Sequence, residues 1–152
     1  MEGRFVRPEN PNAQNVQSIG FAIIIKKVNA EEKEIFLKGI EHFNSREFFE
    51  AHEVWEDVWF PDVGESRRFY QGLIQIAAGY HHVQNANKKG ALSLLQAGIE
   101  KAQPYGEIYC GMRLGEFLEK VKHSVKVIES LTPRDLTTLH PTLAPQIELD
   151  KE

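Results

Sequence analysis

The feature that most restricts the fold is a long stretch without a single charged side chain, from Phe69 to Asn87. Its apolar residues recur at helical spacing, so that Leu73, Ile76 and Tyr80 lie on one side of a helix. Glutamine, histidine and asparagine interrupt the apolar run, which disfavours a membrane-spanning segment. The stretch therefore predicts a buried helix at the centre of a helical domain.

Helical periodicity and end signals predict four more helices around the central one. Asn29 with Glu32, and Asn44 with Glu47, have the spacing of a capping box at a helix start. The predicted helices span about residues 29–44, 44–59, 66–83, 91–103 and 113–129. Neither a repeat period nor regularly spaced strand signals are recognised, and the connections are short. The predicted fold class is all-α, a compact bundle of about five helices.

The two ends of the chain are predicted to lie outside the bundle. Residues 1–28 contain two prolines and a short β-branched run, 21–25, and are predicted as an irregular extension with an edge strand or packing arm. Residues 29–131 form the helical domain. Residues 132–152 contain three prolines and are predicted as a tail that wraps the bundle or frays.

Composition excludes several classes of function. A formal net charge of -4 gives no electrostatic reason to bind a polyanion, so nucleic acid is not an expected partner. Cys110 is the only cysteine, which rules out an intrachain disulfide and a thiolate cluster and favours a reducing compartment. The first residues lack the apolar stretch of a secretory signal. We therefore expect a cytoplasmic protein without a membrane partner.

The helix at 44–59 carries a polar pair inside an aromatic stripe. His52 and Glu56 stand at the i, i+4 separation, whereas Glu53 belongs to a second, acidic stripe that can face water. An unpaired buried carboxylate would cost several kcal/mol, in order of magnitude. Glu56 is therefore expected to have a partner.

The central helix offers a polar face that could supply this partner. Glycine costs ~1 kcal/mol relative to alanine inside a helix, so two glycines on this face suggest that a backbone or a ligand approaches closely. We expect this face to meet the side of the preceding helix that carries His52 and Glu56. The face consists of Arg68, Gln71, Gly72, Gln75, Gly79 and His82.

Two interpretations of this cluster remain open. In the first, a His52–Glu56 ion pair, with Arg68 and the glutamines, locks the register of the two helices. In the second, His52, Glu56 and His82, with Glu53 or His81 as an alternative further ligand, bind a divalent metal such as zinc, manganese or iron. Neither the zinc motif His-Glu-x-x-His nor, at His52, the Glu-x-x-His spacing of di-iron bundles is present.

Several segments of the chain together carry a resemblance to a known family. They are Phe43–Asn44, Glu50–Glu56 with Trp59, Phe69–Ala78, then Asn87, Gly90–Ala91, Leu94–Leu95 and Gly98, and Tyr105–Leu118. These segments resemble a bacterial and archaeal family known as domain of unknown function 309. The resemblance implies a compact all-α bundle and covers about residues 30–130. Such proteins have been described as metal-dependent hydrolases on general grounds, a role that would use His52, Glu53, Glu56 and His82.

The expected function is a binding or assembly module whose polar cluster fixes packing or receives a small polar ligand. A complete set of nucleophile, base and oxyanion donors is not visible in the sequence. The alternative is a metal-dependent hydrolase, with His52, Glu56 and His82 on the metal. Glu53 would then activate water, and Arg68 or Gln75 would orient the substrate. An exposed part of the aromatic stripe could also join two copies into a homo-oligomer.

Overall fold

The computed structural model describes residues 18–59 and 64–150, and within them it leaves out the side chains of 18–29, 58–59 and 139–141. The described elements are helical apart from one small antiparallel hairpin, which confirms the all-α class. No described helix has both the length and the apolar content needed to cross a bilayer. In chain order the elements are α2 (Ser18–Asn44), α3 (Phe48–Trp59), α4 (Arg67–Gln84), α5 (Lys88–Ala102), η1 (Gln103–Tyr105), β1 (Ile108–Tyr109), β2 (Met112–Arg113), α6 (Leu114–Glu129) and α7 (Pro133–Leu143).

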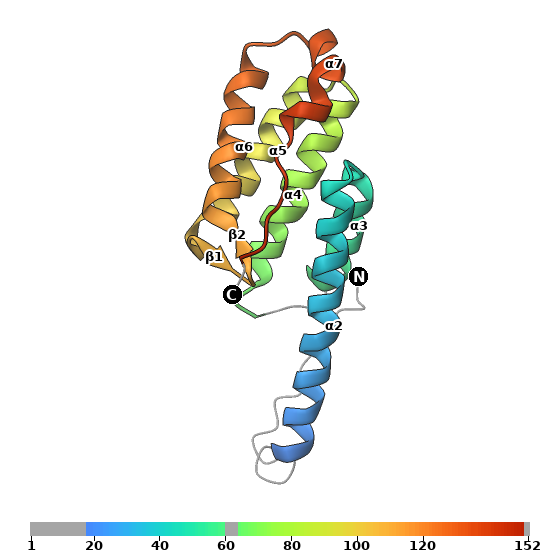
Figure 1. Ribbon diagram of the computed structural model, residues 1–152, viewed down its shortest axis with the longest axis vertical. Helices are drawn as coiled ribbons and strands as arrows, with labels where there is room; N and C mark the ends of the chain where they lie inside the picture. The colour runs from blue at the N-terminus through green and yellow to red at the C-terminus, as the bar shows by residue number, and fades with distance from the viewer. Residues whose placement is uncertain (1–17, 60–63, 151–152) are drawn as a thin grey trace.

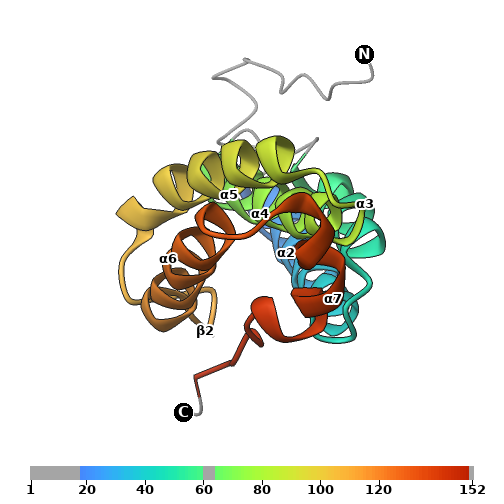
Figure 2. The same cartoon turned by 90° about the horizontal axis from the view of Figure 1, so that it is seen from above.

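The helices follow an arc, which is visible from above (Figure 2). Two antiparallel helix pairs, α2 with α3 and α4 with α5, pack against each other through α3 and α4, and α6 continues the arc beside α5. The chain after α6 turns back, so that α7 and the residues that follow it lie on the inner side of the arc (Figures 1 and 2). The inner side is thus covered by the chain's own C-terminal part.

The two helix pairs are built alike, at a constant offset along the sequence. In each pair a glycine of the first helix lies directly against a large side chain of the second. Each turn between the helices has one non-glycine residue at positive φ, 66° in the first turn and 59° in the second. The corresponding residues are Gly39 and Gly79, Arg46 and Ala86, Ala51 and Ala91, and Trp55 and Leu95. A tandem repeat of helix pairs is therefore present, although the sequence pattern predicted none.

The core is centred on Phe43, near the end of α2. Its ring lies 5.0 to 6.2 Å, centre to centre, from four other buried rings. Those rings come from α3, α4 and α6, so one side chain ties four helices together. The four are Phe48, Trp55, Tyr80 and Phe117.

Most predicted helix ends lie within one residue of the structure, but the starts of three helices differ. Helix α3 begins at Phe48 and not at 44, α5 begins at Lys88 and not at 91, and α2 begins well before its predicted start. The predicted spans 66–83 and 113–129 match α4 and α6 to within one residue. Helix α2 begins at Ser18, so the boundary at residue 29 is wrong. Neither glycine nor proline occurs between residues 21 and 38, so nothing in this run breaks the helix. The predicted loop over residues 1–17 lies outside the described residues.

The residue expected to cap α3 has another place in the structure. Asn44 is the last residue of α2, and α3 begins only at Phe48 after a turn. The backbone N–H of Glu47 donates to the carbonyl of His42 at 2.9 Å and closes this turn. The side chain of Asn44 is therefore not an N-cap of α3 and is available for a distant contact.

Candidate functional site

The predicted pair of His52 and Glu56 forms, but at the surface. The His52 Nε2 atom lies 3.4 Å from a carboxylate oxygen of Glu56, and the Glu56 side chain is 47% exposed. The side of α3 that enters the core carries Phe48, Ala51 and Trp55 instead. The expectation that Glu56 is buried among aromatic rings is therefore wrong, because α3 is rotated so that water solvates its carboxylate.

The other predicted site residues lie apart from this pair. His82 contacts the turn after α4, where its Nδ1 atom is 3.0 Å from the Asn87 amide nitrogen. Glu53 and Arg68 are exposed, and Gln75 is half-buried. Among the described residues, no group of three or more His, Cys, Asp or Glu side chains converges as a metal site would require. The metal and catalytic roles of these residues stay predictions.

The two glycines of the central helix face α5 and not α3. A Cβ atom on Gly72 would lie 2.9 Å from the carbonyl oxygen of Gly98, and one on Gly79 would lie 2.8 Å from Leu95 side-chain atoms. The close approach of another backbone, expected from these glycines, is confirmed. The expectation that this face as a whole meets α3 is wrong, because the glycines allow α4 to pack tightly on α5.

A polar seam nevertheless runs between α3 and α4. The ring of Phe49, 45% exposed, lies 5.9 Å from the ring of His52 and 5.3 Å from that of His81, centre to centre. The buried Nδ1 atoms of both histidines have no hydrogen-bond partner among the residues that the structure describes. The same holds for Oε1 of Gln75, which lies about 120° around α4 from His81. His52 and Gln75 were predicted as site residues from the sequence, and His81 only as an alternative further metal ligand. The small polar ligand expected at this cluster stays a prediction.

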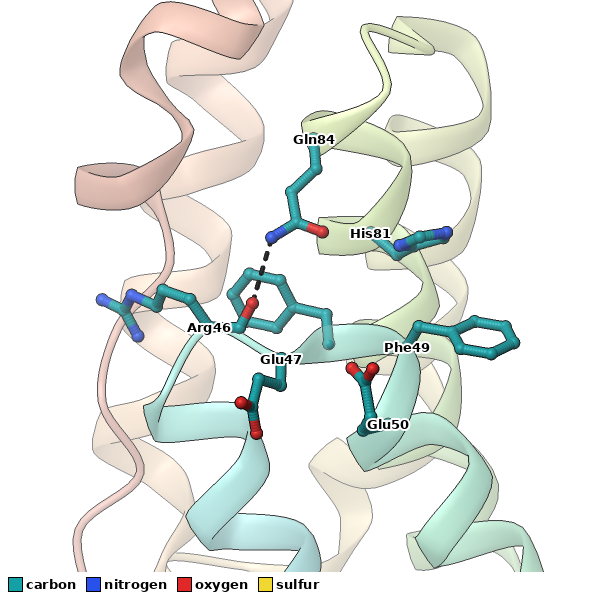
Figure 3. A pocket seen from close by; sticks show the side chains of 7 residues that line it. Arg46, Glu47, Phe49, Glu50, His81 and Gln84 are labelled. Carbon is teal, nitrogen blue, oxygen red and sulfur yellow. Dashed lines mark hydrogen bonds between the residues drawn. The ribbon is translucent and has the colours of Figure 1, made fainter.

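At one end of this seam the surface is hollowed into a pocket of about 450 Å³ (Figure 3). The amide of Gln84 on α4 donates to the carbonyl of Arg46 in the turn after α2, at 3.0 Å, and bridges the pocket's two sides. Acidic and basic side chains are mixed, so the pocket has no dominant charge. Its lining residues are Arg46, Glu47, Phe48, Phe49, Glu50, His81 and Gln84.

A second candidate site lies on the inner side of the arc, where residues 144–150 run as an extended segment that we call the strap. Figure 1 shows the strap descending from α7 in front of α4, between α2 and α6, to the β-hairpin. Ala144 and Ile147 are 3% and 4% exposed, so two strap side chains enter the core. Residues 132–152 were predicted as a tail that wraps the bundle or frays. Residues 144–150 wrap the bundle, and helix α7, which lies in the same tail, was not predicted.

The upper end of the strap is held by polar side chains of the helices. The hydroxyl of Ser124 donates to the carbonyl of Leu143 at 2.6 Å, and the Arg46 guanidinium donates to the carbonyl of Ala144 at 2.6 Å. Tyr80 donates its own hydroxyl to Ser124 at 2.8 Å. Burial raises the pKa of Tyr80 above its ordinary value, so this donor stays protonated at neutral pH.

The middle of the strap is held by one side-chain amide. Asn44 Oδ1 accepts from the backbone N–H of Ile147 at 2.7 Å, and Asn44 Nδ2 donates to the carbonyl of the same residue at 3.0 Å. A neighbouring β-strand would satisfy the same two main-chain groups of a residue. Asn44 therefore binds the main chain of the strap, as a neighbouring strand would, and this contact does not discriminate between side chains.

The lower end of the strap pairs with the β-hairpin. The backbone N–H of Arg113 donates to the carbonyl of Glu148 at 2.9 Å, and the N–H of Asp150 donates to the carbonyl of Gly111 at 2.7 Å. These bonds place the strap antiparallel to β2, so that it adds to the hairpin as a third chain. The site is thus a groove, made by Asn44, Arg46, Ser124 and the edge of β2, that holds an extended polypeptide by its main chain.

The fold defines a class, an all-helical domain of tandem helix pairs, and part of the chain matches a known family. The model of the family described as Domain of unknown function (DUF309) matches residues 36–94. This segment covers the last third of α2, all of α3 and α4, and part of α5. The match agrees with the resemblance that the sequence indicated, over residues 36–94.

Two curated relatives extend the comparison. "Uncharacterized protein YpuF" of Bacillus subtilis (strain 168) is 29% identical over 96 residues, which cover 61% of this chain and 55% of that protein. An "Uncharacterized protein" of Aquifex aeolicus (strain VF5) is 26% identical over 96 residues, which cover 60% of this chain and 29% of that protein. The chain thus spans about half or less of the length of these relatives. Neither their names nor the family description supports the hydrolase alternative.

Proposed function

We propose that this domain is a binding module that holds an extended polypeptide segment on the inner side of its helical arc. The observation that supports the proposal is the mode of contact in the groove. Asn44, Arg46, Ser124 and β2 all reach main-chain atoms of residues 143–150. Contacts of this kind bind any chain that can extend along the groove, and the strap is the segment that does so in cis.

The edge of the β-hairpin offers the groove a general way to bind a separate chain. An uncovered strand edge presents free N–H and C=O groups, and an extended peptide can add to it as a further strand. In this domain the strap covers the edge of β2. A segment from another chain with the same backbone path would make the same hydrogen bonds.

The test uses the full chain with its own strap displaced. In the Ile147→Asp variant a carboxylate falls at a position that is 4% exposed, so the strap should leave the groove. A fluorescein-labelled peptide of residues 142–152 should then bind saturably, as measured by fluorescence anisotropy. The unmodified chain should bind it at least roughly tenfold more weakly, because its own strap competes at a high effective concentration.

The matched control is the same peptide carrying Ile147→Asp, which should bind neither protein. Circular dichroism establishes that the variant chain keeps its helices, and Ile147→Ala serves as a milder displacement if it does not. Absence of saturable binding to a folded variant would refute the proposed function.

A further inference from the structure

Resting on the proposed function, we infer that the groove selects an acidic, aliphatic segment of a partner protein. Such a segment has a small residue first, an aliphatic residue three positions later, and acidic residues one and three positions after that. The strap shows this pattern as Ala144, Ile147, Glu148 and Asp150. The groove contacts each of these positions in a different way. Together these contacts select the side chains of a partner segment as well as the path of its main chain.

The residues at the first two positions are selected by the space available for their side chains. Ala144 is 3% exposed, and the guanidinium of Arg46 fixes its carbonyl at 2.6 Å. A larger side chain there would have to displace packed neighbours. Ile147 is 4% exposed, and Asn44 holds both of its main-chain groups. Its side chain is therefore directed into the core, where an aliphatic group is favoured over a polar one.

The acidic positions are selected by charge. The guanidinium of Arg113 lies 3.6 Å from a carboxylate oxygen of Glu148 and 3.8 Å from one of Asp150. Residues two apart in an extended chain project to the same side, so both acids of such a segment can face this one cation. Glu116 of α6 also lies 3.8 Å from Arg113 and partly neutralises it. All these groups are 40% or more exposed, so we expect a contribution of a few-fold and not a large one.

The remaining strap positions constrain the partner less. Leu149 is 42% exposed, so its side chain faces water and carries little selectivity. The exposed Gln146 makes one long bond, from its side-chain amide to the carbonyl of Asn44 at 3.4 Å, and Pro145 is half-buried. The partner is therefore described by the small residue, the aliphatic residue and the two acids alone.

The test compares labelled peptides of residues 142–152 on the full chain carrying Ile147→Asp. The Ala144→Leu peptide should bind roughly tenfold more weakly than the unmodified one, because the groove has no space for the larger side chain. A peptide with Glu148→Gln and Asp150→Asn should bind roughly two- to tenfold more weakly at low salt, and this difference should shrink at high salt. On a chain that also carries Arg113→Gln, the charged and neutral peptides should bind alike.

The outcomes separate this inference from the function on which it rests. If a scrambled peptide of the same composition binds as well as the unmodified one, the selectivity is refuted while the binding function stands. If no peptide binds, both fail. If the unmodified chain forms a dimer that the peptide dissociates, as measured by light scattering, a second copy is the partner and the inferred separate partner is wrong.

Discussion

Replacing Trp55 with alanine is expected to lower the free energy of unfolding by about 3–5 kcal/mol. The side chain is fully buried, its ring lies 6.2 Å from that of Phe43, and its Nε1 donates to the carbonyl of Phe36 at 3.1 Å. Truncation leaves a cavity in the centre of the aromatic core and removes the hydrogen bond between α3 and the carbonyl of Phe36. Urea denaturation followed by circular dichroism measures the loss.

The control for this variant is Phe49→Ala, on the same helix. Phe49 is 45% exposed, so its loss should cost less than about 1 kcal/mol. Equal losses for the two variants would contradict the assignment of Trp55 to the core and Phe49 to the surface.

Replacing Gly98 with valine is expected to destabilise the fold by about 2–3 kcal/mol. A Cβ atom at this position would lie 2.6 Å from the carbonyl oxygen of Gly72 and 2.6 Å from a side-chain carbon of Ile76. The backbone of α4 can accommodate the added side chain only if α4 moves away from α5. The loss is again measured by urea denaturation.

The matched control is Gln96→Val, at an exposed position of α5. Valine is a slightly poorer helix former than glutamine but a better one than glycine, so this control should cost less than about 0.5 kcal/mol and helix propensity cannot account for a loss at Gly98. If Gly98→Val were no more costly than this control, the two helices could not be in backbone contact at that point.

Local periodicity explains which parts of the fold the sequence could predict. The apolar spacing of the central helix and of the helix at 113–129 placed both within one residue of α4 and α6. The start of α2 was missed because Asn29, with Glu32, has the spacing of a helix cap although it lies inside a continuous helix. A capping pattern shows where a helix can begin. Helix α2 begins further upstream because no helix-breaking residue interrupts the chain there.

The candidate seam was predicted only in part, for a reason of geometry. A helical projection shows which residues share a face, and it correctly grouped Gly72 with Gly79. It does not show which neighbour that face meets, and the glycines face α5 while His81 faces Phe49 on α3. His81 lies outside the predicted face, about 160° or more around the helix from the glycines, so α4 contacts α5 and α3 on different sides.

The groove could not be predicted, because its contacts carry almost no sequence signal. Asn44 and Ile147 are separated by 103 residues, and the bonds between them involve the main chain of Ile147. Any residue can offer those two main-chain groups, so the sequence of the strap is only weakly constrained at most positions. Asn44 itself was predicted to be the N-cap of a helix, which is a common role of asparagine.

The most direct test of the account is amide hydrogen exchange at Ile147, measured by NMR in the unmodified chain and in Asn44→Ala. Because Asn44 Oδ1 accepts from this N–H at 2.7 Å, the amide should be protected in the unmodified chain. In the variant it should exchange roughly ten- to a hundredfold faster, since the bond is lost while the helices remain. If Ile147 in the unmodified chain exchanges as fast as an amide of an unstructured peptide, the strap does not lie in the groove and the account is contradicted.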